Sequence, residues 1–320
     1  MQPNFTDQDV AEVRQLNRKL NRLPRLRMKT TLGRVVLNVL LRIVEIYPML
    51  RSLRSGDRPK LETIERLGKR VKVRIFKPRR PCRGVILDCH GGGWTIGNAR
   101  MADTQNAALA ARLGVTVISI DYRLALSNPL AMLIDDCEAV MMWAIGQAES
   151  KFGSRRIIVK GSSAGAHLAA ATLLRLRDRD NAIGRIDGAV LLFGLYDFSG
   201  TAMVRNAGPE TLILHGPTVR ATLCKLTPGL TDAERKSPAI SPAYADLTGL
   251  PPALFIVGTE DILLEDSQRM EARWRIANEN SELLIAPDSS HAFNHMGTSV
   301  ARKIEQYMDD WILARFTQDR

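Results

Sequence analysis

Two glycine-rich motifs, each directly after a short apolar run, constrain the fold of this 320-residue chain more than any other feature. The first is His90-Gly91-Gly92-Gly93-Trp94, after the apolar run 84–89. The second is Gly161-Ser162-Ser163-Ala164-Gly165, after the run 157–160 and at the start of a helical pattern over 164–178. A strand that enters a tight glycine turn and leaves as a helix is typical of a parallel sheet covered by helices.

Strand and helix patterns alternate through most of the chain from residue 71 onward. The run 71–76 alternates like an edge strand, and later β-branched and apolar runs predict buried strands. We therefore predict an α/β fold with a mainly parallel central sheet flanked by helices. The predicted strands are 71–76, 84–89, 115–120, 157–160, 188–193, 254–257 and 283–286, and the predicted helices are 104–113, 133–150, 164–178 and 300–316.

Two regions fall outside this alternation. Residues 6–56 carry two amphipathic helical patterns that end before the break Gly56-Asp57-Arg58-Pro59. We predict that residues 1–60 form an N-terminal helical cap and that 61–320 form the main α/β domain. Residues 199–245 contain five prolines and one helical piece, which predicts an inserted cap or lid over the carboxyl edge of the sheet.

The positive charge of the chain is concentrated at its N-terminus. Residues 1–60 hold thirteen lysines and arginines against five acids, so they carry +8 of the net charge of +11. Aromatic residues make up only 5% of the chain, and no recognised nucleic-acid module accompanies the charge, so we do not expect nucleic-acid binding. A basic amphipathic segment favours a weak contact with anionic membrane surfaces, which we carry as an additional hypothesis.

Four cysteines, Cys82, Cys89, Cys137 and Cys224, show no C-x-x-C spacing and no pattern of a disulfide framework. Cys89 and Cys137 lie in apolar contexts, so we expect both to be small buried side chains. No secretory leader and no bilayer-spanning apolar stretch is apparent. These features favour a cytoplasmic protein, and nothing in the sequence calls for a metal or another cofactor.

Ser163 occupies the centre of the second motif and is the candidate nucleophile. At neutral pH a serine hydroxyl becomes a good nucleophile only when a base takes its proton and an acid holds that base in place. Where the serine lies on a turn between a strand and a helix, these residues follow in the chain order Ser, Asp or Glu, His. His291 follows the last predicted strand and is the preferred base, with His295 as its competitor. Asp261 follows the strand 254–257 and is the preferred acid, with Glu260 as the alternative.

The other three histidines have different expected places. His167, one turn into the helix after Ser163, is expected to pack or to form a hydrogen bond. His215 falls within the insertion, where a surface position is expected, although it could line a pocket. His90 is expected to hydrogen-bond the glycine loop rather than to act as a base.

The first motif supplies the groups that acyl-transfer chemistry needs opposite the nucleophile. The transition state carries negative charge on the former carbonyl oxygen, which fixed backbone N–H groups stabilise. Gly92, Gly93 and Ala164 are the candidate donors of this oxyanion hole. The candidate substrate-binding residues are Gly91, Trp94 and Ser162.

Taken together, five short motifs resemble the hormone-sensitive-lipase family of α/β-hydrolases. They are His90-Gly91-Gly92-Gly93-Trp94, Asp121-Tyr122-Arg123-Leu124-Ala125, Gly161-Ser162-Ser163-Ala164-Gly165, Gly258-Thr259-Glu260-Asp261 and His291-Ala292-Phe293, and the resemblance covers residues 70 to 318. It implies a serine carboxylesterase that acts on small-molecule esters of short to medium acyl length through an acyl-enzyme on Ser163. It also implies the triad Ser163, Asp261 and His291, and a homodimer is common in the family.

The chain departs from the family pattern at three places. Ser162 stands where the family often has aspartate, the run Leu126-Ser127-Asn128-Pro129 replaces Pro-Glu-His-Pro, and Ala292 replaces the glycine after the histidine. None removes a triad member, but the substrate range is left open. Gly165-Ala166-His167 is similar to kynurenine-formamidase-like members, so an amidase or arylformamidase is the alternative. A non-catalytic ligand receptor of the same fold is a third hypothesis.

Overall fold

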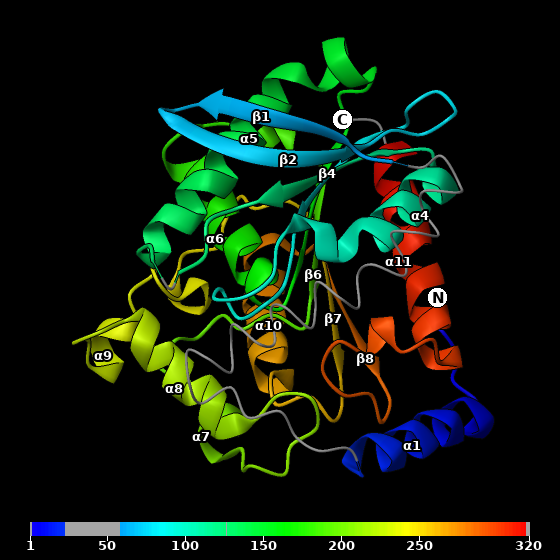
Figure 1. The fold of residues 1–320 in the computed structure, drawn as a ribbon, viewed down its shortest axis with the longest axis vertical. Coiled ribbons are helices and arrows are strands. Elements are labelled where there is room, and N and C mark those ends of the chain that lie inside the picture. Colours follow the sequence, from blue (N-terminus) through cyan, green and yellow to red (C-terminus); the bar gives the residue numbers. More distant parts are fainter. Residues whose placement is uncertain (1, 23–57, 126, 318–320) are drawn as a thin grey trace.

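An eight-stranded sheet organises the molecule, with the strand order β1-β2-β4-β3-β5-β6-β7-β8 (Figure 1). The computed structural model describes residues 2–22, 58–125 and 127–317. β2 runs antiparallel to β1 and to β4, and all other neighbouring strands are parallel, which confirms the predicted mainly parallel sheet. The strands are β1 (Lys60–Arg66), β2 (Lys69–Phe76), β3 (Val85–Cys89), β4 (Thr116–Asp121), β5 (Ile157–Ser162), β6 (Gly188–Leu192), β7 (Ala253–Gly258) and β8 (Ser281–Ala286).

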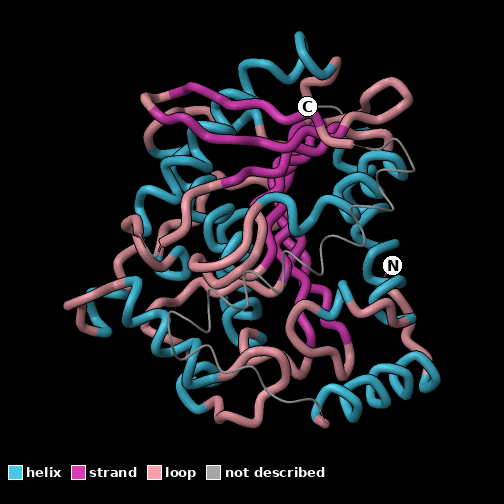
Figure 2. The backbone as a smooth tube through the Cα atoms, in the orientation of Figure 1, coloured by secondary structure: helices cyan, strands magenta, loops and turns pink. Residues whose placement is uncertain are grey.

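Helices cover both faces of this sheet, as Figure 2 shows for the strands enclosed between helical segments. One face carries α5, α6 and α10, and the other carries α4 and α11. The predicted helices of the main domain are confirmed to within three residues at each end. Their bounds are α4 (Asp103–Leu113), α5 (Leu130–Phe152), α6 (Ala164–Asp178) and α11 (Ser299–Thr317). A further helix, α10 (Leu264–Asn278), follows β7, and 3-10 turns lie at η1 (Ala99–Ala102), η2 (Ile183–Arg185) and η4 (Phe293–His295).

Each central strand contributes to two hydrophobic cores because successive side chains point to opposite faces of a sheet. In β3, Val85 and Leu87 pack into the core beneath α5 and α6, whereas Ile86 packs into the core beneath α4 and α11. All five β3 side chains are buried. Cys89 is buried as predicted, next to Cys137 of α5, with 3.9 Å between the two Sγ atoms and no disulfide.

One strand prediction is wrong. β2 is not an edge strand, because β1 pairs with its outer side from Lys60 opposite Ile75 to Arg66 opposite Lys69. β1 has the sequence KLETIER, and Ile64 is its only buried side chain. With a single buried side chain, β1 shows no apolar alternation, so the pattern that reveals the other strands is missing here.

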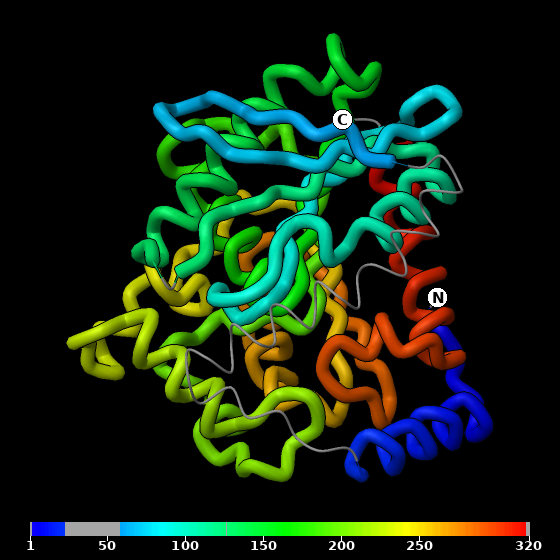
Figure 3. Tube along the Cα trace, viewed as in Figure 1, coloured from blue at the N-terminus to red at the C-terminus, as the bar shows by residue number. Residues whose placement is uncertain are grey.

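The N-terminal helix α1 (Asp7–Asn21) confirms the first of the two predicted N-terminal helices. It begins at Thr6, which forms a capping box with Asp9, and it packs beside α11 with Val13 buried. Figure 3 shows this blue helix beside the orange loop that follows β8. The second predicted helix, over residues 32–48, lies outside the described residues. Within the described ranges, no helix is long and apolar enough to cross a membrane.

The insertion between β6 and β7 contains several short helices rather than one. It packs against α6 and α10, the helices that follow β5 and β7. Its elements are α7 (Ala202–Asn206), α8 (Gly216–Leu226), α9 (Asp232–Arg235) and the 3-10 turn η3 (Pro242–Tyr244). A position beside α6, whose first residue directly follows Ser163, is suited to a wall of a substrate pocket.

Candidate active site

Ser163 lies at a sharp turn between β5 and α6 and has a strained backbone. Its φ of 54° and ψ of −120° fall in a region that non-glycine residues rarely adopt, and such strain is common at functional sites. The two glycines of the motif are required by close backbone contacts. A Cβ on Gly161 would lie 2.3 Å from the Gly165 carbonyl oxygen, and one on Gly165 would lie 2.0 Å from that of Cys89.

The structure brings the three predicted triad residues together. The Ser163 hydroxyl lies 3.0 Å from His291 Nε2, and His291 Nδ1 lies 2.7 Å from Asp261 Oδ2. Asp261 is 1% exposed, and its other carboxylate oxygen accepts the backbone N–H of Leu263 at 2.9 Å. Because the carboxylate can only accept, His291 carries its proton on Nδ1, which leaves Nε2 free to accept the serine proton.

The two rival residues lie elsewhere. The Glu260 side chain is exposed, whereas Asp261 is buried. His295 is also exposed and lies 3.2 Å from the Gln105 amide, away from the triad hydrogen bonds. The left-handed φ of 58° at Ala292 interrupts the chain before η4, so His291 and His295 do not share one helical face.

The glycine loop is curled against the nucleophile. Gly92 has a φ of 124°, and a Cβ there would lie 2.1 Å from the Ile96 carbonyl oxygen, so only glycine fits. In the described part of the chain, no acceptor is found for the N–H groups of Gly92, Gly93 or Ala164. Ala164 is the first residue of α6, where backbone N–H groups have no partner within the helix. Three free donors are therefore available beside Ser163.

The three predicted substrate-binding residues differ in their exposure. Gly91 lies directly against the elbow, because a Cβ there would be 3.5 Å from Ser163 Cβ. Ser162 is half-buried at the end of β5. The Trp94 side chain, in contrast, is 4% exposed, and its indole N–H donates to His167 Nδ1 at 3.2 Å. Trp94 therefore points into the protein and supports the glycine loop from behind.

His90 holds the start of the glycine loop. Its Nδ1 lies 2.7 Å from the Gly91 carbonyl oxygen and donates to it, and its ring stacks on Tyr122 with 4.1 Å between ring centroids. The Tyr122 hydroxyl in turn donates to the His90 carbonyl at 2.6 Å. Burial lowers the pKa of His90 below its ordinary value, so the ring is neutral at neutral pH.

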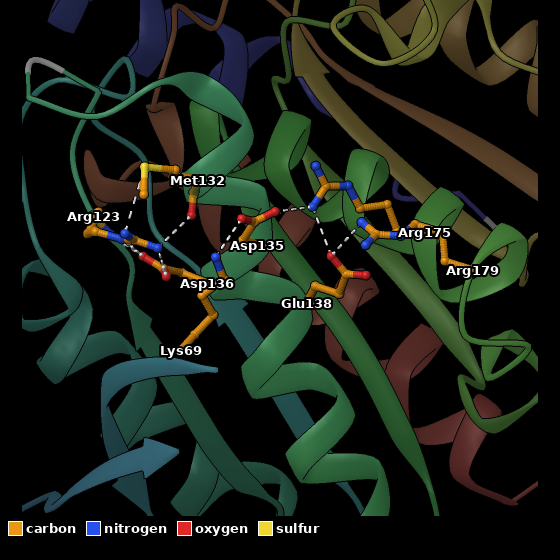
Figure 4. A network of polar contacts seen from close by, with 8 residues as sticks. All are labelled: Lys69, Arg123, Met132, Asp135, Asp136, Glu138, Arg175 and Arg179. Atoms are coloured by element: carbon orange, nitrogen blue, oxygen red, sulfur yellow. Dashed lines mark hydrogen bonds and ion pairs between the residues drawn. The ribbon is translucent and has the colours of Figure 1, made fainter. Parts of the chain in front are cut away.

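The second half of the Asp121–Ala125 motif ties this loop to helix α5. Arg123 forms a two-pronged ion pair with Asp136, at 2.6 and 2.8 Å, and two residues later the Ala125 N–H donates to the Trp94 carbonyl at 2.8 Å. Arginine suits this place because its planar fork matches a carboxylate. Figure 4 shows the pair within a larger network that includes Lys69, Met132, Asp135, Glu138, Arg175 and Arg179.

The remaining two histidines have structural contacts. His215 caps the N-terminus of α8, where its side chain accepts the Thr218 N–H. His167 is fully buried, with Nδ1 bonded to Trp94 and Nε2 at 2.8 Å from the Ile240 carbonyl oxygen. Both nitrogens of His167 are therefore used within the protein.

Phe193 lies beside the triad, but the sequence analysis places it in a strand and not among the site residues. It directly follows β6, has a φ of 38°, and packs edge-on against His291 with ring centroids 4.8 Å apart. Its position at the carboxyl end of a central strand was the available signal, since such ends border the site in open α/β sheets. Because its side chain is apolar like those of the strand, the sequence pattern does not separate Phe193 from the end of β6.

A family model described as an α/β-hydrolase fold matches residues 86–295, a span that includes the glycine loop, the elbow, Asp261 and His291. The chain belongs to this family, the hormone-sensitive-lipase-like α/β hydrolases.

Solved structures agree with this assignment. A bacterial heroin esterase is 25% identical, with a TM-score of 0.82 over 98% of each chain. The esterase LipW of Mycobacterium marinum is 24% identical, with a TM-score of 0.84 over 99% of each chain. An esterase of Pyrobaculum calidifontis is 24% identical, with a TM-score of 0.80 over 93% of this chain and 97% of that one. The α/β-hydrolase fold predicted from the motifs is confirmed, and the chain is an esterase-like member of the family.

Proposed function

We propose that the chain is a serine carboxylesterase that hydrolyses short- to medium-chain acyl esters through an acyl-enzyme on Ser163. The observation that carries the proposal is the unbroken hydrogen-bonded line from Ser163 through His291 to Asp261, beside three unoccupied backbone N–H groups. Each part of this arrangement has a role in ester hydrolysis, and the strained backbone of Ser163 is costly to maintain without one.

In the first half-reaction, Ser163 Oγ attacks the ester carbonyl carbon while His291 Nε2 takes the hydroxyl proton. The carbonyl oxygen becomes negatively charged and is stabilised by the N–H groups of Gly92, Gly93 and Ala164, each worth about 3 kcal/mol in comparable enzymes. Asp261 stabilises the imidazolium that forms. His291 then returns the proton to the departing alcohol oxygen as its bond to the acyl carbon breaks.

In the second half-reaction, water attacks the acyl carbon and His291 takes its proton. The bond between Ser163 Oγ and the acyl carbon breaks, Ser163 recovers a proton, and a carboxylic acid leaves. No redox step or co-reactant other than water is needed. The name of the heroin esterase, one of the solved relatives, agrees with ester chemistry in this fold.

The test is a series of p-nitrophenyl esters from C2 to C12, with Ser163→Ala as the blank. We expect turnover that is highest at the shorter chains and is lost in the variant. Equal rates in both proteins would remove Ser163 from the mechanism. A fluorophosphonate should label wild type and fail to label Ser163→Ala, and no labelling of wild type would favour the receptor hypothesis.

The amidase alternative uses the same triad and is tested beside the ester. His167 suggested it, but this residue is fully buried and both of its ring nitrogens are bonded within the protein. We therefore expect a higher kcat/KM on an aryl ester than on N-formylkynurenine. The opposite order would make the chain an arylformamidase.

A further inference from the structure

His167 connects three parts of the site that come from distant segments. Its Nδ1 accepts the indole N–H of Trp94 at 3.2 Å, and Trp94 directly follows Gly92 and Gly93 in the glycine loop. Its Nε2 lies 2.8 Å from the Ile240 carbonyl oxygen in the insertion. His167 itself belongs to α6, one turn after Ser163.

These contacts determine the protonation of the ring. An indole nitrogen can only donate and a carbonyl oxygen can only accept, so the neutral ring must carry its hydrogen on Nε2. Burial lowers the pKa of His167 to about 4, so this neutral form holds at neutral pH. The result is a directed chain of hydrogen bonds from Trp94 through His167 to Ile240.

The surroundings leave these groups little freedom. Trp94 is 4% exposed and His167 is fully buried, and Phe198 packs against both rings, with centroids 5.0 and 4.8 Å away. The Trp94 backbone has a left-handed φ of 59°, and its carbonyl oxygen is held by the Ala125 N–H. The indole N–H is thus the side-chain anchor of the residue that ends the oxyanion loop.

On this basis we propose that His167 is a positioning residue that fixes the oxyanion loop through Trp94, while its bond to the Ile240 carbonyl keeps the ring hydrogen on Nε2. The inference rests on the proposed esterase function, because it concerns the same oxyanion hole. Catalysis by preformed N–H donors depends on their placement to a fraction of an ångström, so loosening the loop should lower transition-state stabilisation.

Two substitutions separate the two bonds of His167. Asparagine places an amide oxygen near the position of Nδ1, so His167→Asn can still accept from Trp94 but loses the Ile240 bond. Glutamine places an amide nitrogen near the position of Nε2, so His167→Gln can still donate to Ile240 but loses the Trp94 bond. Trp94→Phe removes the indole donor and keeps an aromatic ring in the same space.

The experiment measures kcat and KM on p-nitrophenyl butyrate, normalised to the fraction of Ser163 labelled by a fluorophosphonate. We expect kcat to fall about tenfold in His167→Gln and in Trp94→Phe with KM nearly unchanged, because the lost interaction serves the transition state. His167→Asn should stay within about threefold of wild type. The double variant that combines His167→Gln with Trp94→Phe should fall no further than either single variant, because both remove the same bond. His215→Asn, a capping histidine of α8, is the matched control and should match wild type.

Three results would overturn the inference. One is an equal fall in the asparagine and glutamine variants, and another is a wild-type kcat per labelled site in Trp94→Phe. The third is a loss explained entirely by a smaller labelled fraction or a lower Tm, which is what a purely structural role predicts. If wild type itself shows no turnover that depends on Ser163, it is the proposed esterase function that fails, which is distinct from a failure of the positioning role of His167.

Discussion

At the scale of single residues, the proposed mechanism depends on which nitrogen or oxygen atoms hold a few protons. Asp261 keeps the His291 proton on Nδ1, and the nitrogen that faces Ser163 is therefore free to accept. Glu260 carries the same charge one residue earlier but is exposed. Identical chemistry at adjacent positions thus has different consequences because only one side chain is directed at the histidine.

Asp261→Asn should lower kcat by about 10⁴ while the protein stays folded, because the amide can donate to His291 and favour the wrong tautomer. Glu260→Gln is the matched control and should remain within about twofold of wild type, since surface substitutions seldom matter. Steady-state kinetics on p-nitrophenyl butyrate check both. A similar loss in the two variants would return Glu260 as a candidate acid.

The buried neutral His167 should make stability depend on pH. Its folded pKa of about 4 lies below the ordinary value of 6.5, so the unfolded chain binds more protons between these values. Stability is therefore complete above pH 6.5 and is lost as the pH falls toward 4. From pH 7 to pH 5 the free energy of unfolding should drop by about 2 kcal/mol on this account.

Urea denaturation of wild type and His167→Asn at these two pH values measures this contribution. The variant lacks the titrating ring, so its drop should be smaller than that of wild type by about 2 kcal/mol. An equal drop in both proteins would show that His167 is not the group responsible.

At the scale of elements, the strand–elbow–helix unit is set by backbone contacts that helix propensity does not reveal. Gly165 is within α6, where alanine is normally favoured over glycine by about 1 kcal/mol. Yet a Cβ there would lie 2.0 Å from the Cys89 carbonyl oxygen, at the end of β3. Gly146 is an exposed residue of α5, and a Cβ added there would have no neighbouring atom within 4 Å.

The same substitution should therefore have opposite effects at the two sites. Gly146→Ala should raise the free energy of unfolding by about 0.5–1 kcal/mol. Gly165→Ala should lower it by more than about 3 kcal/mol, because a backbone must move away from the added methyl. Thermal and urea unfolding of both variants test this. A stabilised Gly165→Ala would mean that the elbow tolerates a wider separation from β3.

At the scale of the whole molecule, the N-terminal helix is joined to the catalytic body. Arg14 and Asn17 of α1 bond to Asp288 before His291, and Glu12 accepts the Ser299 N–H after it. Helix α1 thus forms hydrogen bonds on both sides of the segment that carries His291. Deleting the N-terminal segment to test membrane contact would also disturb the triad, so charge substitutions are the better test.

We propose that the basic N-terminal segment makes a weak contact with anionic membrane surfaces, with about 1 kcal/mol for each lysine or arginine near the surface. Replacing Arg25, Arg27, Lys29 and Arg34 with glutamine should reduce co-sedimentation with phosphatidylserine vesicles at low salt. The control removes the same charge from the catalytic body, at the exposed residues Arg70, Lys72, Arg83 and Lys225. If both variants co-sediment with the vesicles to the same extent, the binding depends on overall charge and not on the N-terminal segment.

The sequence by itself determined the fold and was enough to predict the triad residues, because both follow from local sequence patterns. Apolar runs ending in glycine turns mark strand ends, and parallel strand ends meet at one edge of a sheet, so Ser163, Asp261 and His291 could be expected together. What the tertiary structure decided are contacts between segments far apart in the chain. Which surfaces meet in the fold decides the outer position of β1 and the burial of the Trp94 side chain. It also decides the packing of Phe193 on His291 and the hydrogen bonds that connect Trp94 to Ile240 through His167. Such contacts leave no periodic trace in the sequence.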